Sequence, residues 1–474
     1  MAGLLATCRA QGQYNEAEKL ARQILEGREP KGDQSLAAKS DLARVLADQS
    51  RYDEAKVLVT EVMVQRRWEL GANHPDTLAS TAELGAILVC QAQWEKSEQV
   101  LGPVMVQMNQ NLGKDHRYTL SVTSNLAKAY VHLERYEKAE KLQLEVLNTR
   151  KQILGEEHPD TLDSLDDLAL TYCRRGGFAK AEELQLALIN SRAKVLGVKH
   201  RDTLNARARL LETYDGQGRY LEAVQLGKLV VEEMKEIMGE EHPDTITAMG
   251  RWAWAYSQVG QHADAHPLNV QVAKTLEQKL GPDDPQTLEA KADLALSYVQ
   301  MGDLESGKKL AGEVFGRQLL VSSYSTRQWI NNLCTVLINV GDFDEAAKLG
   351  IQALSEFEKV VGPNHHDTIV ATSNLALVYN GQRKHEEAAR LAQKAVEKSS
   401  VQLGQDHPVS LVSTFNLALI KFELGEQEGA LDVWRQILPS IRAKLGENHD
   451  VTIKCKVYLE KFTQRSGFLN QATP

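Results

Sequence analysis

Apolar and small residues return along the chain in a fixed order that predicts pairs of packed helices. One helix of each pair carries Leu-Ala-x-x-Tyr, as in Leu126, Leu168, Leu294 and Leu375 with the residues that follow them. Ten residues after that leucine, most copies have an aromatic residue: Tyr14, Tyr52, Trp94, Tyr136, Phe178, Tyr220 and Phe343. Three residues further comes a small residue: Ala17, Ala55, Ser97, Ala139, Ala181, Ala223, Ala265, Ala346, Ala388 and Ala430. A large residue facing a small one lets the two helices of a hairpin cross closely.

The helix pairs repeat with a constant period. Glycines mark intervals of 42 residues: Gly71, Gly113, Gly155, Gly197, Gly239 and Gly281, with Gly362, Gly404 and Gly446 resuming the step. Many of them begin a linker of the form Gly-x-x-His-Pro-Asp-Thr. A period of this size indicates one supersecondary unit stacked on copies of itself, so the chain is predicted to be a solenoid.

The linker has the residues that end one helix and begin the next. Gly155 suits a positive φ just beyond a helix C-terminus. His158 lies at the next N-cap position, and Pro159 fits the first helical position, where no N–H is needed. Asp160 then meets the positive end of the helix.

These motifs closely resemble the tetratricopeptide repeat in its 42-residue variety, which is found in kinesin light chains and in repeat arrays of NLR-like signalling ATPases of fungi and bacteria. The resemblance covers nearly the whole chain and implies an all-α, right-handed superhelical solenoid of about 22–23 helices without strands. HEAT repeats are the alternative of similar length, but they lack this Leu-Tyr-aromatic-Ala register.

Ten full repeats are expected from residue 36 onward, with a partial repeat before them and a single helix after them. The predicted segments are a partial repeat at 1–35, arrays at 36–316 and 317–450, and a capping helix with a tail at 451–474. Because Leu4 already occupies the leucine slot, the first repeat is cut short. This end is expected to continue into a longer chain or to make a homotypic contact.

One joint between repeats is irregular. The step from Gly281 to Gly362 is 81 residues rather than 84, and the linker at 321–326 lacks His-Pro-Asp-Thr. Three glycines in the preceding helix weaken it by up to about 1 kcal/mol each: Gly307, Gly312 and Gly316. Residues 302–326 are therefore the predicted hinge.

Composition narrows the class of partner. Charged residues make up 25% of the chain with a net charge of −9, and the basic residues are interspersed, so nucleic acid is not expected as a partner. The 5 cysteines show no close pairing, no apolar run approaches the length of a membrane span, and no secretory leader is recognisable. A soluble, cytoplasmic protein with no membrane partner is expected.

The row of linker histidines raises the question of metal binding. They are His74, His116, His158, His200, His242, His365, His407 and His449. Stacked helices lie about 8–10 Å apart, whereas zinc needs nitrogen ligands at about 2 Å, so neighbouring linkers cannot share an ion. Helix capping is the expected role. No P-loop, G-x-S-x-G or HExxH motif is present, and neither a catalytic residue nor a cofactor is predicted.

The resemblance implies that an extended peptide binds in a concave groove lined by the first helix of each repeat. One helical stripe should face it, and one slot of that stripe repeatedly holds Asn, in the Asn-Leu-Ala context of kinesin light chains. Asn125, Asn374 and Asn416 match this context, and Asn332 matches it in part because Leu-Cys follows. Each amide can both donate to and accept from a peptide backbone.

A basic-aromatic patch interrupts the otherwise acidic groove. Lys128, Arg209 and Arg251, with Trp254 on the same stripe, predict an acidic or carboxylate-bearing peptide as ligand. The alternative is that these side chains only solvate a helix face. The sequence thus predicts a non-enzymatic, adaptor-like scaffold for protein segments, or alternatively the ligand-sensing array of an NLR-like signalling ATPase whose P-loop domain is not in this chain.

Overall fold

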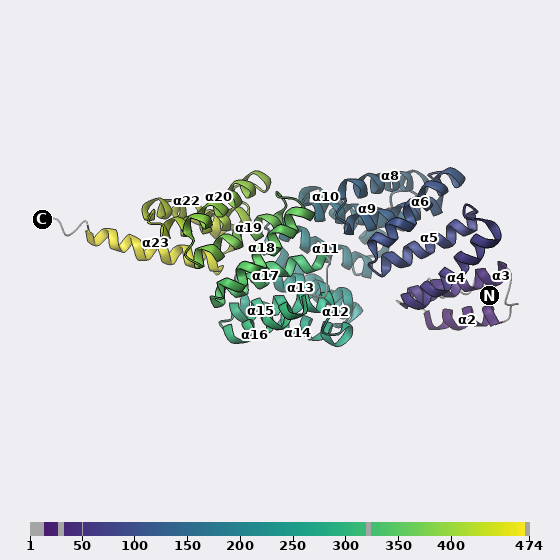
Figure 1. Ribbon diagram of the computed structural model, residues 1–474, viewed down its shortest axis with the longest axis horizontal. Helices are drawn as coiled ribbons and strands as arrows, with labels where there is room; N and C mark the ends of the chain where they lie inside the picture. Colours follow the sequence, from purple (N-terminus) through teal and green to yellow (C-terminus); the bar gives the residue numbers. More distant parts are fainter. Residues whose placement is uncertain (1–13, 27–32, 50, 319–323, 470–474) are drawn as a thin grey trace. The chain divides into compact units, whose positions relative to one another are not determined.

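The computed structural model describes residues 14–26, 33–49, 51–318 and 324–469. Within these ranges it contains 22 helices and no strand, so the predicted all-helical solenoid is confirmed (Figure 1). The predicted partial repeat lies partly in 1–13, outside the described residues, where the homotypic contact was also expected.

The helices alternate along the chain as antiparallel pairs. The first of them are α2 (Tyr14–Glu26), α3 (Asp33–Asp48), α4 (Tyr52–Leu70), α5 (Pro75–Cys90), α6 (Trp94–Leu112), α7 (Arg117–His132), α8 (Tyr136–Leu154) and α9 (Pro159–Arg175). There follow α10 (Phe178–Leu196), α11 (Arg201–Gly216), α12 (Tyr220–Met238), α13 (Pro243–Gln258), α14 (His262–Leu280), α15 (Pro285–Gln300) and α16 (Leu304–Gln318). The last are α17 (Tyr324–Val340), α18 (Phe343–Val360), α19 (His366–Gly381), α20 (His385–Gln402), α21 (Pro408–Glu423), α22 (Gln427–Leu445) and α23 (Asp450–Leu469).

Each linker that carries the capping histidine ends one helix and caps the next as the sequence predicts. Gly155 has φ 91°, a backbone conformation that side chains other than glycine rarely adopt. The Nδ1 atom of His158 accepts the backbone N–H of Asp160 at 3.2 Å, and the other seven linker histidines make the corresponding bond. Asp284 replaces the histidine in one linker and caps α15 in the same way. The predicted capping role of the histidines is confirmed.

The small residues of the pattern lie where paired helices cross. Ala139, Ala181 and Ala265 are fully buried. At Gly216 a Cβ atom would come within 2.1 Å of the Phe178 ring, so the aromatic residue of one helix rests directly on the backbone of the next. The aromatic-and-small register thus stabilises the hairpins through close packing.

The chain divides between Thr171 and Tyr172, inside α9, into two compact units, residues 1–171 (unit 1) and 172–474 (unit 2). In unit 2 a single hydrophobic cluster includes Leu296 before the irregular joint and Leu333 after it. Residues 319–323 of the predicted hinge lie outside the described residues. The hinge and the segment boundaries at 316 and 450 stay predictions.

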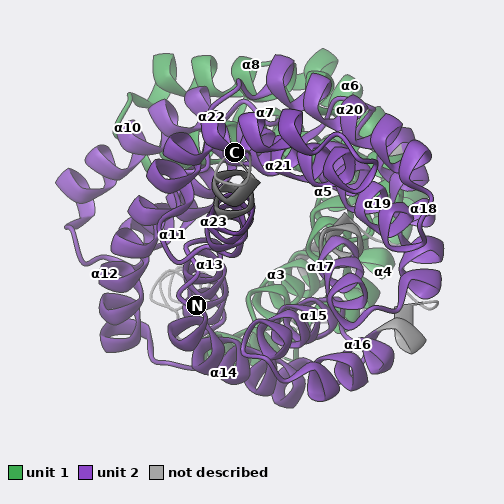
Figure 2. Ribbon diagram, turned by 90° about the vertical axis from the view of Figure 1, so that its left-hand side faces the viewer, with its two compact units in different colours: residues 1–171 green, residues 172–474 purple. Residues whose placement is uncertain are grey.

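Unit 2 curls until its later repeats lie on its earlier ones. Tyr220 and Val259 share a hydrophobic cluster with Leu411, Ile441 and Leu445. In Figure 2 the helices of unit 2 follow one another around a common centre.

Candidate functional site

The solenoid has an inner and an outer layer of helices. Odd-numbered helices pack on their odd-numbered neighbours, as α11 does on α13 and α15 on α17. In unit 2, Figure 2 shows α11, α13, α15 and α17 inside the even-numbered helices. The odd-numbered helices, here called the inner layer, carry every residue of the predicted binding site.

Side chains of successive inner-layer helices bond to one another in a regular ladder. Six pairs of residues, each 39 positions apart, form its rungs: Arg44 with Glu83, Lys128 with Asp167, Asn205 with Asp244, Glu212 with Arg251, Asp215 with Trp254, and Asp293 with Asn332. Residues three positions apart lie on the same face of a helix, so a step three residues short of the 42-residue period joins neighbouring helices. Asp293 and Asn332 differ in that they occupy the same slot of two repeats across the shortened joint. Much of the predicted stripe therefore connects repeat to repeat.

Arg251 is part of this ladder and is not a free cation. Its Nη2 donates to Glu212 Oε2 at 2.6 Å, and its Nη1 lies 3.4 Å from the carbonyl oxygen of Ala208. Burial would raise the pKa of the Glu212 carboxyl, but Arg251, Arg174 and Arg209 outweigh it and hold this pKa below its ordinary value. The positive charge of Arg251 is therefore already paired within unit 2.

Trp254 is also bound within the protein. Its Nε1–H donates to Asp215 Oδ1 at 2.8 Å, and its ring packs against the hydrophobic cluster around Leu296. Burial raises the pKa of Asp215 to about 6, although His366 and the bond from Trp254 oppose the shift. The indole thus joins α11 to α13.

The α15 helix places two carboxyl groups on this layer that make no direct contact with a basic side chain among those that the structure describes. Asp293 accepts a hydrogen bond from Asn332 Nδ2 at 2.6 Å. Glu289, one turn earlier, has no hydrogen bond or ion pair with any described residue. Burial raises the pKa of Asp293 to about 7 and, with repulsion from Asp293, that of Glu289 to about 8, although Arg174 and Arg251 oppose the shift of Glu289.

In unit 1, Lys128 lies 3.3 Å from the carboxylate of Asp167, and both side chains stay partly exposed. Asn125, one turn earlier on α7, is half-buried and has no hydrogen-bond partner in the part of the chain that the structure describes. The residue 39 positions before Asn125 is Ala86, which offers no polar atom for a rung. The Asn125 amide is thus available to a ligand.

The remaining amides differ from one another. Asn374 on α19 is half-buried and, like Asn125, has no hydrogen-bond partner among the described residues. Asn416 on α21 is only 6% exposed, and its Nδ2 donates to Ser373 Oγ at 3.2 Å. Arg209 is half-buried near Glu212. Asn416 can reach a ligand only if its bond to α19 breaks.

Sequence reasoning missed two acidic partners in the ladder, Glu212 and Asp215, and the unpaired carboxyl group of Glu289. All three lie on the helical stripe that was predicted to face the groove, so the stripe itself was informative. The signal that would have identified two of them is a polar partner 39 residues further along the chain.

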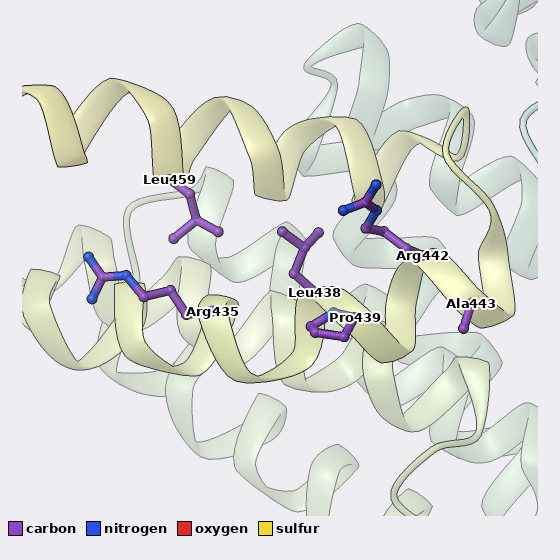
Figure 3. Close-up of a pocket in the computed structure, with 6 residues that line it drawn as sticks. All are labelled: Arg435, Leu438, Pro439, Arg442, Ala443 and Leu459. Atoms are coloured by element: carbon purple, nitrogen blue, oxygen red, sulfur yellow. The ribbon is translucent and has the colours of Figure 1, made fainter.

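Two surface depressions lie away from the ladder. One, of about 540 Å³, is lined by α22 and α23 residues that Figure 3 shows: Arg435, Leu438, Pro439, Arg442, Ala443 and Leu459. Its two arginines are bound to Asp432 and Glu447. The other, of about 980 Å³, lies beside Trp68 on α4, whose side chain is 85% exposed. Neither depression contains a residue of the predicted site.

Two further classes of site were searched for in the described ranges. No group of three or more His, Cys, Asp or Glu side chains could hold a metal ion there. None of the helices in those ranges combines the length and the apolar character needed to cross a membrane.

Comparison with known proteins places the repeats in a family. Two family models, both described as tetratricopeptide repeat, match more than half of the chain, at residues 118–189, 325–399 and 371–443 and at residues 35–76, 203–244 and 245–286. A search of curated proteins found no significant match.

Solved structures with similarity to the chain include other repeat proteins. A Podosopora anserina protein described as a kinesin light chain with nearly identical TPR-like repeats is 27% identical, with a TM-score of 0.38 over 42% of this chain and 95% of that one. BtubC (BKLC) from P. vanneervenii is 19% identical, with a TM-score of 0.38 over 47% of this chain and 89% of that one. A Rap protein complexed with competence and sporulation factor is 11% identical, with a TM-score of 0.49 over 84% of this chain and 100% of that one. On the evidence of its repeat motifs and of the matched family models, the chain belongs to the tetratricopeptide repeat family.

Proposed function

We propose that the protein is an adaptor-like scaffold that binds an extended segment of a partner protein along its inner layer. Tetratricopeptide repeats generally serve protein–protein interaction and typically have no catalytic activity. The observation that carries the proposal is the pair of half-buried amides, Asn125 in unit 1 and Asn374 in unit 2, which have no partner among the described residues. Each amide offers both a donor and an acceptor, and a peptide backbone supplies the matching acceptor and donor.

The ladder changes the expected charge of the segment. The expectation of an acidic ligand depended on Arg209 and Arg251, but Arg251 is held by Glu212. Among the described side chains, no basic group is in direct contact with Glu289 or Asp293. We therefore infer that the segment is neutral or basic where it passes α15, because an acidic side chain there would be repelled as soon as either carboxyl group is ionised.

If the chain is instead the ligand-sensing array of an NLR-like signalling ATPase, its ligand would bind the same inner layer. The same experiment therefore applies to this alternative. A homotypic contact at the first repeat remains a separate prediction.

The proposal is tested with peptides selected on the full-length chain from a displayed library of random sequences. The affinity of the best peptide is then measured for the wild type, Asn125→Ala and Asn374→Ala. The matched control is Asn148→Ala, which removes an exposed amide from the outer helix α8.

We expect at least one inner-layer variant to weaken binding about five- to tenfold, since a hydrogen bond contributes about 1 kcal/mol, with Asn148→Ala unchanged. Equal affinity for all four proteins would remove the inner-layer amides from the account.

A further inference from the structure

Three consecutive linkers of unit 2 contact the backbone of residues that lie about 191 positions earlier in the chain. His365 Nε2 is 3.3 Å from the carbonyl oxygen of Arg174, and His407 Nε2 is 3.0 Å from that of Gly216. Both separations are 191 residues. At the third linker, a Cβ on Gly260 would come within 2.1 Å of the Asn448 carbonyl oxygen. Because the period is 42 residues, successive repeats make the same return contact, and these three contacts are here called the clasp.

The imidazole of His407 makes both of its bonds only when it is neutral. Nδ1 accepts the backbone N–H of Val409 at 3.2 Å, which caps α21, so it must carry no proton. Nε2 faces a carbonyl oxygen, so it must carry the proton and donate. A second proton on Nδ1 would point at the N–H of Val409 and break the cap. His365 has the same pair of partners, Asp367 N–H and the Arg174 carbonyl.

Linker histidines outside the clasp lack this second bond. His200 caps α11 through Nδ1 at 3.2 Å, but its side chain is 42% exposed, against 12% for His365. No described residue bonds to the Nε2 atom of His200. The linker motif is thus the same in both places, and the return contact alone distinguishes the clasp histidines.

We propose that His365 and His407 form a pH-sensitive clasp that holds the later repeats of unit 2 on its earlier ones and releases them when the imidazoles are protonated. This inference does not depend on the proposed function. Release would change the inner layer as well, because Gly216 directly follows Asp215, the partner of Trp254.

The charged groups around the clasp act in both directions. Burial lowers the pKa of His407 to about 4, with His366 and Lys444 adding repulsion, although the bond to the Gly216 carbonyl opposes the shift. Burial likewise lowers the pKa of His449 to about 4, with His262 and Lys454 repelling and Asp450 attracting its proton. Protonation gains attraction where a histidine lies 3.4 Å from a carboxylate, as His365 and His366 do from Asp367 and His262 does from Asp450. These pairs oppose release, so the opening depends mainly on the buried imidazole of His407.

The pH window follows from these values. A released His407 imidazole titrates near the ordinary 6.5 and the clasped one near 4, so the closed form loses population as the pH falls from 6.5 to 4. At pH 5 His407 should favour the open form by on the order of tenfold relative to pH 7.5.

The experiment measures one distance inside unit 2 of the full-length chain. Spin labels are attached through Lys228→Cys on α12 and Gln436→Cys on α22, both exposed sites on helices that pack together. The background carries Cys8→Ser and Cys90→Ser, because the other cysteines are buried. Distances are recorded at pH 7.5 and pH 5, with helicity followed by circular dichroism.

The wild type should show a longer distance at pH 5, reversibly and with its helicity retained. His407→Asn keeps a capping side chain but loses the bond to Gly216, so it should show the longer distance at pH 7.5. The matched control, His200→Asn, should behave as the wild type. His365→Asn, which loses the bond to the Arg174 carbonyl, serves where His407→Asn fails to fold.

An unchanged distance at pH 5 would overturn the proposal, as would a loss of helicity before any change of distance. An equal effect of His200→Asn and His407→Asn would also overturn it.

Discussion

The guanidinium of Arg251 donates from Nη2 to Glu212 Oε2 at 2.6 Å, and this ion pair joins α13 to α11 in unit 2. Both side chains are about 30% exposed, so water screens the pair only in part. It is therefore expected to stabilise the contact between two repeats as well as to set the charge of the inner layer.

The first prediction concerns the stability that this pair supplies. Arg251→Met should lower the free energy of unfolding of the full chain by about 1–3 kcal/mol, because Glu212 keeps its charge and loses its partner. Urea denaturation followed by circular dichroism measures the change. The double variant Arg251→Met with Glu212→Leu should recover most of the loss.

The matched control for this prediction is Lys128→Met, since Lys128 is 43% exposed in its pair with Asp167. It should cost less than about 1 kcal/mol. Equal losses for Arg251→Met and Lys128→Met would contradict the distinction between the two rungs. If Arg209 and Arg251 were exposed charges, as the sequence suggests, the double change Arg209→Glu with Arg251→Glu would leave stability nearly unchanged. The structure predicts destabilisation instead, because a carboxylate at position 251 would face Glu212.

A second prediction uses the carboxyl group of Glu289. Its pKa is raised to about 8 in the folded protein, mainly by burial, against 4.5 when unfolded. Between these values the folded state binds more protons than the unfolded state, so Glu289 makes the protein less stable as the pH rises from 4.5 to 8.

Glu289→Gln should therefore raise the stability at pH 8.5 by about 1–3 kcal/mol and have little effect at pH 4.5. Thermal unfolding at both pH values measures this difference. Glu305→Gln, on an exposed site of α16, is the control and should change neither value. A gain at pH 4.5 as large as that at pH 8.5 would count against this account of Glu289.

A third prediction tests the return contact by sterics instead of pH. Gly260 and Gly302 both have positive φ, 75° and 88°, so alanine is strained by about 1 kcal/mol at each. Only at Gly260 would the new Cβ also meet another segment, the Asn448 carbonyl, whereas nothing lies within 4 Å at Gly302.

Gly260→Ala should consequently lengthen the distance between the labels at positions 228 and 436 at pH 7.5, and Gly302→Ala should not. If both variants keep the wild-type distance, then the later repeats do not rest closely on Gly260.

Much of the fold could be predicted because it depends on local chemistry. The His158 cap and the positive φ of Gly155 involve residues within one linker, and the burial of Ala139 involves one hairpin. Every repeat carries the same motif, so an atypical residue in one copy does not change the predicted fold. The 39-residue rungs were missed because they require the register between successive inner helices, which a single helical stripe does not contain.

Other features depend on distances beyond one repeat. The contact of His407 with Gly216 results from the rotation that accumulates over several repeats, which no single linker encodes. Asn416 and Asn374 occur in the same Asn-Leu-Ala context, yet Asn416 is buried against Ser373 and Asn374 has no partner among the described residues. Local context therefore identifies the slot but not whether its amide is available.

The central claim is that the inner layer binds a protein segment, and site-specific photocrosslinking tests it most directly. A benzophenone amino acid is placed at Asn374 on the inner helix α19 or, as the control, at Asn148 on the outer helix α8, and each protein is irradiated with the peptide selected on the wild type. The account predicts a covalent adduct with the peptide from position 374 and none from position 148. Adducts from position 148 with none from position 374 would contradict it.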